Sequence, residues 1–209
     1  YALGAQVTVM DINPGLLRSL EYQYQQRIDT MYCTQETIAS VLPNTDMVIN
    51  CVKWPKQRKD FLITKEMLKT MEPGSVLVDI SNDNPGAIES SYETHHDNPR
   101  YVCNGVVHYC VSNIPGAVAH STSVALAGET LPMLLNIMNN GLTEACVRDG
   151  YIRRSLTAYK GYLTHEETSG IQGRPWIKPE DVLGIADRKL DPAPPATTTR
   201  SNNFITCCK

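Results

Sequence analysis

The sequence predicts an α/β fold in which a doubly wound parallel sheet is covered by helices on both faces. Three observations predict it: short runs of β-branched residues typical of buried strands, helices with capping signals between them, and a repeated strand–helix–strand spacing. The chain has 209 residues, of which 42% are hydrophobic and 20% charged. This length and composition are enough to bury a sizeable core.

The first element expected is a strand over residues 6–11, with the sequence QVTVMD. Its β-branched residues and flanking turn signals favour a strand buried on both faces. Asn13 is placed to cap the next helix, with Pro14 at the first helical position. That helix continues over residues 16–27.

Two further helix–strand pairs and one more strand follow. They are expected at residues 34–42 and 46–52, at 64–71 and 75–80, and at 105–111. Strands joined by helices at this spacing form parallel crossovers. After Pro115 the pattern changes to a long helix over 121–141, which contains Pro132, and then to helical and loop segments.

The pattern therefore divides the chain into three parts. Residues 1–119 are expected to form the sheet-containing domain, and residues 120–190 a second, mainly helical part. Residues 191–209 are rich in Pro and Thr and are expected to be disordered.

Composition limits the classes of function. The net charge of -3 and the scattered Lys and Arg argue against a nucleic-acid partner, and the basic residues at 53–59 are interpreted as a solvated loop. No apolar run reaches the about 18 residues of a membrane helix, and no signal peptide is visible. Seven cysteines without a CxxC pair indicate reduced thiols in a cytoplasmic protein. The sequence predicts no metal site, because it contains no cluster of metal-ligating residues at short spacing.

The candidate ligand site lies where the parallel strands end. In an open parallel sheet, ligands bind outside the carboxyl ends of the strands. Each predicted strand ends in polar residues or a turn, namely Asp11, the stretch Cys51, Val52 and Lys53, the stretch Ile80, Ser81, Asn82 and Asp83, and the stretch Val111, Ser112, Asn113 and Ile114.

Asp11 is the most specific of these residues. An acid at the tip of the second strand of a dinucleotide-binding fold accepts hydrogen bonds from the adenosine ribose of NAD and repels the extra phosphate of NADP. The alternative is that Asp11 only caps the next turn or helix. The glycine-rich phosphate loop normally lies about 20 residues before this acid, so the first strand and its loop are expected to precede residue 1.

Two other strand ends allow two readings each. Asp83 either orients a nicotinamide and assists proton transfer, or it only forms a local Asx turn. The turn over residues 111–114 either contacts the nicotinamide ring through its backbone or acts as an interdomain hinge, and both roles are compatible.

Several motifs together resemble those of the alanine dehydrogenases. They are LGAQVTVMDIN, GSVLVDI followed by an acid, VVHYCVSNIPGAV, STSVALAGETLP and GYLTHEE, in order from Tyr1 to about Leu183. The resemblance implies two Rossmann-like domains, with the chain returning to the substrate domain near Ala119 or His120. It also implies reversible NAD-dependent deamination of L-alanine to pyruvate and ammonia, in a homo-oligomer that is usually a hexamer.

The resemblance also assigns site residues. Asp11 corresponds to the ribose-binding acid, and Cys33 lies near the adenosine. Val52 and Lys53 belong to the segment that runs beside the adenine and ribose. The nicotinamide lies between Ile80, Ser81, Asn82 and Asp83 on one side and Val111, Ser112, Asn113 and Ile114 on the other, with Asp83 as the catalytic residue. The family's substrate-binding arginine and lysine and its acid–base histidine have no counterpart here, so these 209 residues alone are expected to be inactive.

Departures from the family pattern keep two alternatives open. Pro85 replaces a glycine and lacks an N–H, Lys53 and Trp54 replace small residues, and Tyr92 replaces an arginine. One alternative is therefore a degenerate, non-catalytic nucleotide-binding or assembly paralogue. The other is an NAD-binding subunit similar to that of the transhydrogenases.

Overall fold

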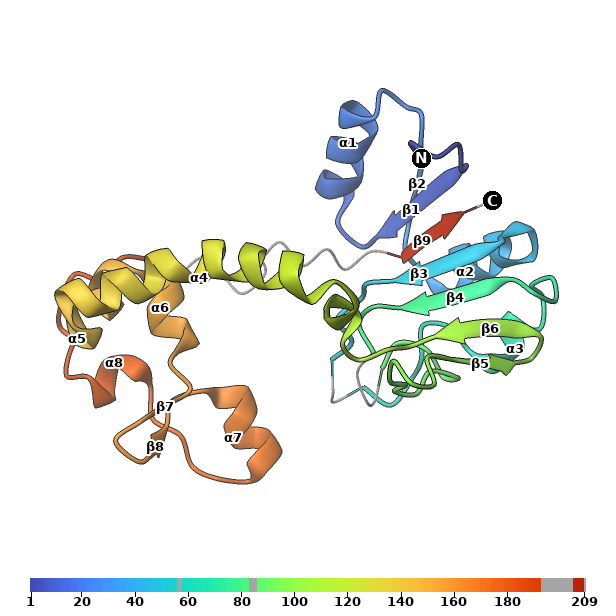
Figure 1. The fold of residues 1–209 in the computed structure, drawn as a ribbon. Coiled ribbons are helices and arrows are strands. Elements are labelled where there is room, and N and C mark those ends of the chain that lie inside the picture. The colour runs from blue at the N-terminus through green and yellow to red at the C-terminus, as the bar shows by residue number, and fades with distance from the viewer. Residues whose placement is uncertain (56–57, 83–85, 193–204, 209) are drawn as a thin grey trace. The chain divides into compact units, whose positions relative to one another are not determined.

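Strands and capped helices alternate along the first half of the chain in the computed structural model, which describes residues 1–55, 58–82, 86–192 and 205–208. Figure 1 shows these elements as a sheet with its connecting helices. They are β1 (Val7–Asp11), α1 (Pro14–Gln23), β2 (Asp29–Tyr32), α2 (Gln35–Val41), η1 (Leu42–Asn44), β3 (Met47–Asn50), α3 (Lys65–Leu68), β4 (Val76–Asp79), β5 (Arg100–Cys103), β6 (Val106–Tyr109) and η2 (Ile114–Val118).

Local signals in the sequence set the helix starts. The Asn13 side chain accepts hydrogen bonds from the backbone N–H groups of Gly15 and Leu16, and Pro14 is the first residue of α1, as predicted. Thr34 and Thr64 cap α2 and α3 in the same way. These caps supply acceptors for amides that have no partner within the helix.

Strand β2 was not expected from the sequence. Its four residues, Asp29–Tyr32, are only partly buried and contain a polar pair, so they lack the apolar signal of a central strand. It pairs in parallel with β1, which leaves it at the edge of the sheet. The edge position explains the weak signal, because an edge strand needs less apolar surface.

The sheet has seven strands in the order β2-β1-β9-β3-β4-β6-β5. The pairs β1–β2, β3–β4 and β4–β6 are parallel, as the predicted crossovers require. Strand β5 pairs antiparallel with β6 at one edge. The carboxyl ends of β1, β3, β4 and β6 therefore meet along one edge of the sheet, where a ligand site is expected.

The C-terminal tail is only partly as expected. The prediction of disorder over 191–209 is wrong for Ile205–Cys208, which form strand β9 at the centre of the sheet. Ile205 and Thr206 are β-branched and the two cysteines are small and apolar, so these four residues suit a buried strand. The Pro- and Thr-rich composition of the preceding residues led to the prediction of disorder for the whole tail. Residues 193–204 lie outside the described part of the chain.

The core of this unit packs against the sheet. It combines residues of several strands with those of the covering helices and loops, and its fully buried members include Met10, Ile38, Leu42, Val48, Ile63, Leu68, Leu77, Val106 and Ile205. Each such side chain contributes about 1.5–3 kcal/mol on burial. The packing holds the strand ends in fixed positions relative to one another.

A second unit begins at Ala119, one residue before the expected boundary, and covers the described residues to 192. It contains α4 (Ala119–Asn140), α5 (Leu142–Arg148), α6 (Gly150–Ser155), β7 (Ala158–Tyr159), β8 (Tyr162–Leu163), α7 (Glu166–Gln172) and α8 (Pro179–Val182). Pro132 lies inside α4. Along the described stretches, no helix is both long and apolar enough to cross a membrane.

Candidate functional site

A cavity of about 660 Å³ lies beyond the carboxyl ends of β1, β2 and β3. Its wall comes from the turns that follow these strands and from the loop after β3. The lining residues are Ile12, Cys33, Thr34, Gln35, Glu36, Val52, Lys53, Trp54, Pro55, Arg58, Asp60, Phe61 and Leu62. A hollow of this size, with an apolar wall and a few polar groups, is suited to a small ligand.

Asp11 is the last residue of β1 and directly precedes Ile12, which lines this cavity. Asp11 is 3% exposed. Its Oδ1 accepts a hydrogen bond of 2.6 Å from the Asn13 N–H, whereas its buried Oδ2 accepts none from the described residues. A buried carboxylate oxygen without a donor is costly, so the position calls for a donor from outside the chain.

The electrostatics of Asp11 follow from this burial. Burial raises its pKa, although hydrogen bonds from the backbone N–H groups of Asn13 and Ile12 oppose the rise. Burial, together with the nearby charge of Asp11, raises the pKa of Cys33 to about 11. Cys33 is therefore a neutral thiol near pH 7. It forms part of the cavity wall and does not act as a nucleophile.

Trp54 fixes the far wall of the cavity. It is buried, and its indole Nε1 donates a 3.0 Å hydrogen bond to the Asp60 carbonyl oxygen. The Arg58 guanidinium lies 4.0 Å above the ring and pairs with the Asp60 carboxylate. The interpretation of residues 53–59 as a solvated loop is therefore incomplete, because Lys53, Trp54 and Arg58 line the cavity together with the acidic Glu36 and Asp60.

Further along the same sheet edge, β3 and β4 are joined by buried polar side chains. The Asn50 Nδ2 donates a 2.8 Å hydrogen bond to Oδ1 of Asp79, and the Ser91 hydroxyl donates to Oδ2 of Asp79. Asn50 and Asp79 are almost fully buried. This network fixes the points at which the chain leaves the two strands.

The loops after β4 and β6 are joined in turn. Asn82 donates a 2.7 Å hydrogen bond from Nδ2 to the carbonyl oxygen of Cys110, which directly precedes Val111. Past Val111, the Asn113 carbonyl oxygen accepts a 2.6 Å hydrogen bond from His96. The structure thus brings the two predicted nicotinamide segments together; Asp83 itself lies outside the described residues.

His108 is a core residue rather than a reactive one. It is completely buried, its Nδ1 donates to the Val106 carbonyl oxygen at 3.0 Å, and its Nε2 lies 2.8 Å from the Ser90 hydroxyl. Burial lowers its pKa, so the ring is neutral near pH 7. The searched part of the structure contains no group of three His, Cys, Asp or Glu side chains arranged for a metal ion.

Comparison with known proteins settles the family. The family described as "Alanine dehydrogenase/PNT, C-terminal domain" matches residues 1–166. The chain belongs to this family. Over 182 residues it is 36% identical to the alanine dehydrogenase of Lysinibacillus sphaericus and 37% identical to that of Halomonas elongata. These alignments cover 87% of this chain and 49% of each relative, so the chain spans about half the length of the curated relatives it matches.

Solved structures give the same family assignment. An L-alanine dehydrogenase superposes with a TM-score of 0.72 and 32% identity, over 82% of this chain and 47% of that one. A transhydrogenase from Sinorhizobium meliloti superposes with a TM-score of 0.50 and 25% identity, over 65% and 38% respectively. The alanine dehydrogenase fold thus accounts for more of the chain, as the motif resemblance predicts.

Within this alanine dehydrogenase fold, the predicted site residues form two groups. Cys33, Val52 and Lys53 line the cavity, and Asp11 directly precedes Ile12 in its wall. The second group is joined through Asn82 and contains Ile80, Ser81, Asn82, Val111, Ser112, Asn113 and Ile114. Ile80 is exposed, whereas Val111 is buried and acts as support rather than as a contact surface.

Sequence reasoning missed the residues that position these groups. Asn50 and Asp79 are joined inside the sheet, and Trp54 is anchored in the cavity wall. One signal was available in advance: an amide in the apolar run DMVINCV needs a polar partner when it is buried. The identity of that partner depends on strand pairing, which the run itself does not reveal.

Proposed function

We propose that this chain contributes the NAD-binding unit, and part of the substrate domain, of an enzyme that reversibly deaminates L-alanine to pyruvate and ammonia. The observation that carries the proposal is the buried Asp11 at the carboxyl end of β1, whose Oδ2 has no donor among the described residues and which directly precedes Ile12 in the cavity wall. Ribose hydroxyl groups are donors of the required kind. The family relationship supports NAD as the nucleotide.

Different residues of the chain bind different parts of the nucleotide. Asp11 accepts from the ribose hydroxyl groups, and its charge disfavours a ribose that carries a further phosphate. The neutral Cys33 and the anchored Trp54 provide an apolar wall for the adenosine. Lys53 is the basic side chain of the lining nearest the end of β3, whereas Arg58 is paired with Asp60.

Residues of the second group orient the nicotinamide and hold or transfer protons. The chemistry that NAD supplies when bound is acceptance of a hydride from Cα of L-alanine, after which water releases ammonia. Asn82 and the turn beginning at Ser112 hold the nicotinamide end in a fixed orientation. Asp83 follows Asn82 in sequence and is proposed as the catalytic acid–base group, on the strength of its correspondence with the family's active-site aspartate.

Titration with NADH tests the nucleotide site. Asp11→Asn is expected to weaken NADH binding about tenfold to a hundredfold in calorimetry, because hydrogen bonds to a charged group contribute about 1.5–3 kcal/mol. Asp29→Asn, which removes an exposed carboxylate at the start of β2, is the matched control and should bind as the unaltered protein does. Equal affinity in the two variants would rule out Asp11 as the ribose ligand.

Turnover of the full-length protein tests the reaction. NADH formation that depends on L-alanine is expected, and Asp83→Asn should reduce kcat at least a hundredfold while leaving the NADH affinity close to that of the unaltered protein. Retention of full activity in that variant would remove Asp83 from the mechanism.

Departures from the family pattern favour a second candidate, a nucleotide-binding paralogue without catalytic activity. Lys53 stands where the family has a small or apolar residue, and Tyr92 where many members have an arginine that contacts the cofactor. NADH binding without L-alanine-dependent turnover in the full-length protein would establish this candidate.

Self-association is part of the first proposal. Helix α4 exposes a run of large apolar side chains, Val124, Leu126, Leu131, Leu134, Leu135 and Met138. Exposed apolar side chains of this kind are covered in the full-length protein either by the rest of the chain or by another copy, and the family resemblance implies a hexamer. Sedimentation velocity of the full-length protein should give a homo-oligomer, and Leu134→Glu should shift it towards the monomer.

A further inference from the structure

Ser91 lies in the loop between β4 and β5, and its hydroxyl group contacts three other parts of the chain. The hydroxyl donates a hydrogen bond to Oδ2 of Asp79, the last residue of β4. Its oxygen also lies 3.5 Å from Oδ1 of Asn82, in the loop after β4, and 3.4 Å from Sγ of Cys110, the residue after β6. One small side chain therefore touches the ends of both strands from which the predicted nicotinamide segments leave the sheet.

Asp79 connects this contact to the interior of the sheet. It is 1% exposed, and its Oδ1 accepts a 2.8 Å hydrogen bond from Nδ2 of Asn50. The Oδ1 of Asn50 accepts a 3.1 Å hydrogen bond from the Val52 N–H, and the Asn50 main-chain oxygen accepts one of 2.9 Å from the Ile80 N–H. A continuous series of hydrogen bonds thus runs from Ser91 to the segment that follows β3.

The carbonyl oxygen of Cys110 is held from two directions. It accepts a 2.7 Å hydrogen bond from Nδ2 of Asn82 and a 2.9 Å hydrogen bond from the Thr94 N–H. The Thr94 carbonyl oxygen in turn accepts a 3.2 Å hydrogen bond from the Ser112 N–H. These bonds fix the start of the turn over residues 111–114 relative to the loop that contains Asn82.

The backbone on either side of Ser91 is held by a single side chain, Tyr101 of β5. The Tyr101 hydroxyl donates a 2.8 Å hydrogen bond to the Ser90 carbonyl oxygen and accepts a 3.1 Å hydrogen bond from the Tyr92 N–H. The rings of Tyr101 and Tyr92 are stacked, with their centroids 3.9 Å apart. Ser91 therefore cannot shift without breaking one of these contacts.

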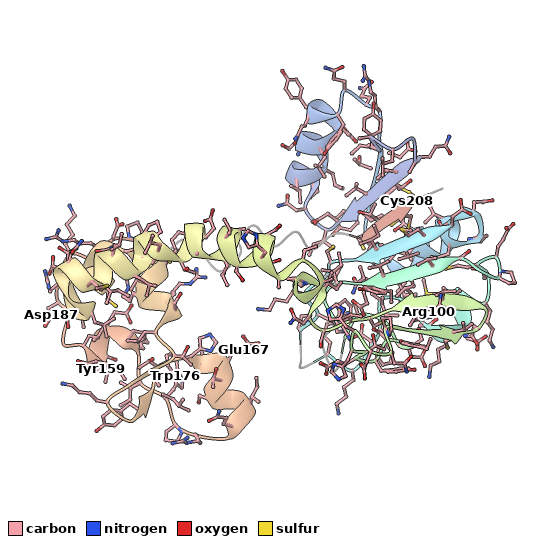
Figure 2. All side chains as sticks on the ribbon, in the orientation of Figure 1. Arg100, Tyr159, Glu167, Trp176, Asp187 and Cys208 are labelled. Carbon is pink, nitrogen blue, oxygen red and sulfur yellow. The ribbon has the colours of Figure 1, made fainter. Side chains whose placement is uncertain are left out.

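Tyr101 is itself fixed against the sheet. It directly follows Arg100, which Figure 2 labels at the start of β5. Its ring stacks on the fully buried His108 at 4.8 Å between centroids, and the Ser90 hydroxyl donates a 2.8 Å hydrogen bond to Nε2 of His108. The position of the Ser91 hydroxyl is thus set by the folded sheet before any ligand binds.

We propose that Ser91 is a positioning residue for the deamination reaction, which holds Asn82 and the residues after β6 in the relative arrangement that orients the nicotinamide ring. Ser91 acts through Asp79 and Asn82, and Asp83 directly follows Asn82 in sequence. The effect on the reaction rests on the proposed function, whereas the contacts of Ser91 do not. Because hydride transfer requires close alignment of the reacting atoms, a displaced loop should lower kcat more than it lowers the affinity for the nucleotide.

Steady-state kinetics of the full-length protein test this role. Ser91→Ala should lower kcat for L-alanine-dependent NADH formation about tenfold to a hundredfold, while the Kd of NADH stays within about twofold of that of the unaltered protein. Ser91→Thr keeps the hydroxyl group and should restore most of kcat. Ser40→Ala is the matched control, because it removes an exposed hydroxyl that bonds to the Thr37 carbonyl oxygen within α2, and it should change neither quantity.

Three kinetic outcomes would overturn the positioning role. One is an unchanged kcat in Ser91→Ala. Another is a fall in kcat that Ser91→Thr does not reverse, which would mean that the hydroxyl group is not what matters. The third is a loss of NADH affinity as large as the loss of kcat, which would indicate general damage to the site.

Tyr101→Phe tests the route by which Ser91 is held. It removes the hydroxyl that bonds to both neighbours of Ser91, so it should lower kcat in the same direction as Ser91→Ala. In the Ser91→Ala background it should lower kcat by less than about twofold further, because the group that it positions is already absent. Independent, multiplying losses in the two variants would contradict this route.

Hydrogen exchange measured by mass spectrometry tests the contacts without relying on the reaction. In Ser91→Ala, peptides covering residues 76–82 and 106–114 should exchange about tenfold faster, while those covering β1 and α1 stay unchanged, and Ser91→Thr should restore the protection. Equal exchange in Ser91→Ala and the unaltered protein would overturn the proposal. Absence of L-alanine-dependent turnover in the unaltered full-length protein would instead overturn the proposed function and the role of Ser91 in it, while the exchange rates would still decide whether Ser91 holds the two loops.

Discussion

The buried Asp11 carboxylate has opposite consequences for stability and for binding. Its Oδ2 is closed off from water without a donor among the described residues, which is costly in the free protein and favourable once a ribose hydroxyl group approaches. Residues kept in such a state are characteristic of binding sites, where part of the stability of the fold is given up for function. A local capping role accounts for Oδ1, which accepts from the Asn13 N–H, but not for Oδ2.

Asp11→Asn is expected to stabilise the free protein at neutral pH although it weakens NADH binding. The folded-state pKa is raised, so the cost of the buried charge is fully present above that pKa and disappears as the pH falls below the ordinary value of 3.8. The asparagine keeps an acceptor for the Asn13 N–H. Thermal unfolding should therefore give a higher Tm for the variant at pH 7, by about 2–4 °C for each kcal/mol gained.

The stability difference between the two proteins should shrink towards zero as the pH is lowered through this window. Asp29→Asn, at an exposed carboxylate, provides the comparison and should show no such pH-dependent gain. A lower Tm for Asp11→Asn at pH 7 would mean that Oδ2 has a donor in the free protein.

At the scale of elements, β3 and β4 are joined by side chains as well as by their main chains. The Asn50–Asp79 hydrogen bond is buried, and Ser91 satisfies the second oxygen of Asp79. Such a network is stabilising only while every member is satisfied. It also determines the direction in which the two site loops leave the sheet.

A double-mutant cycle on Asn50→Ala and Asp79→Ala should show strong coupling. Removal of either partner leaves the other buried without its hydrogen bond, so the two single losses overlap, and a coupling energy of about 0.5–3 kcal/mol is expected from chemical denaturation. The exposed pair Lys69 and Glu66 is the control and should give less than about 1 kcal/mol. Additive losses at Asn50 and Asp79 would show that the network is not a stabilising unit.

At the scale of the whole molecule, the two units have separate cores. The unit beginning at Ala119 is organised around Arg153, which is 5% exposed. Arg153 pairs with Glu180 at 3.0 Å and donates to the carbonyl oxygens of Cys146 and Asp191, each at 2.7 Å. One side chain thus joins three segments of this unit.

Arg153→Ala should destabilise this unit by about 3–5 kcal/mol, because it removes three contacts and leaves Glu180 without its partner. Hydrogen exchange should accelerate in peptides from α5, α6 and α8 and stay unchanged in peptides from β3 and β4. Arg148→Ala removes an exposed ion pair with Glu144 and should cost less than about 1 kcal/mol. Uniform acceleration across both units would show that their stabilities are coupled.

The sequence by itself determined the elements whose signals are local. Strand β1, the Asn13 cap, the Thr64 cap and the parallel crossovers follow from residue type and spacing, because propensity and capping act over a few neighbouring residues. The position of Val52 and Lys53 at a strand end could be anticipated for the same reason, whereas Cys33 followed only from the family resemblance, and the order of the motifs indicated the family.

The tertiary structure alone decided which strand lies between β1 and β3, which partner satisfies Asn50, and which oxygen of Asp11 is left without a donor among the described residues. Each of these depends on contacts between residues far apart in the chain. The sequence ITCC has only a modest preference for a strand, and it is extended here because it pairs with both β1 and β3. Pairing between distant segments, rather than local preference, places β9 beside the candidate nucleotide site.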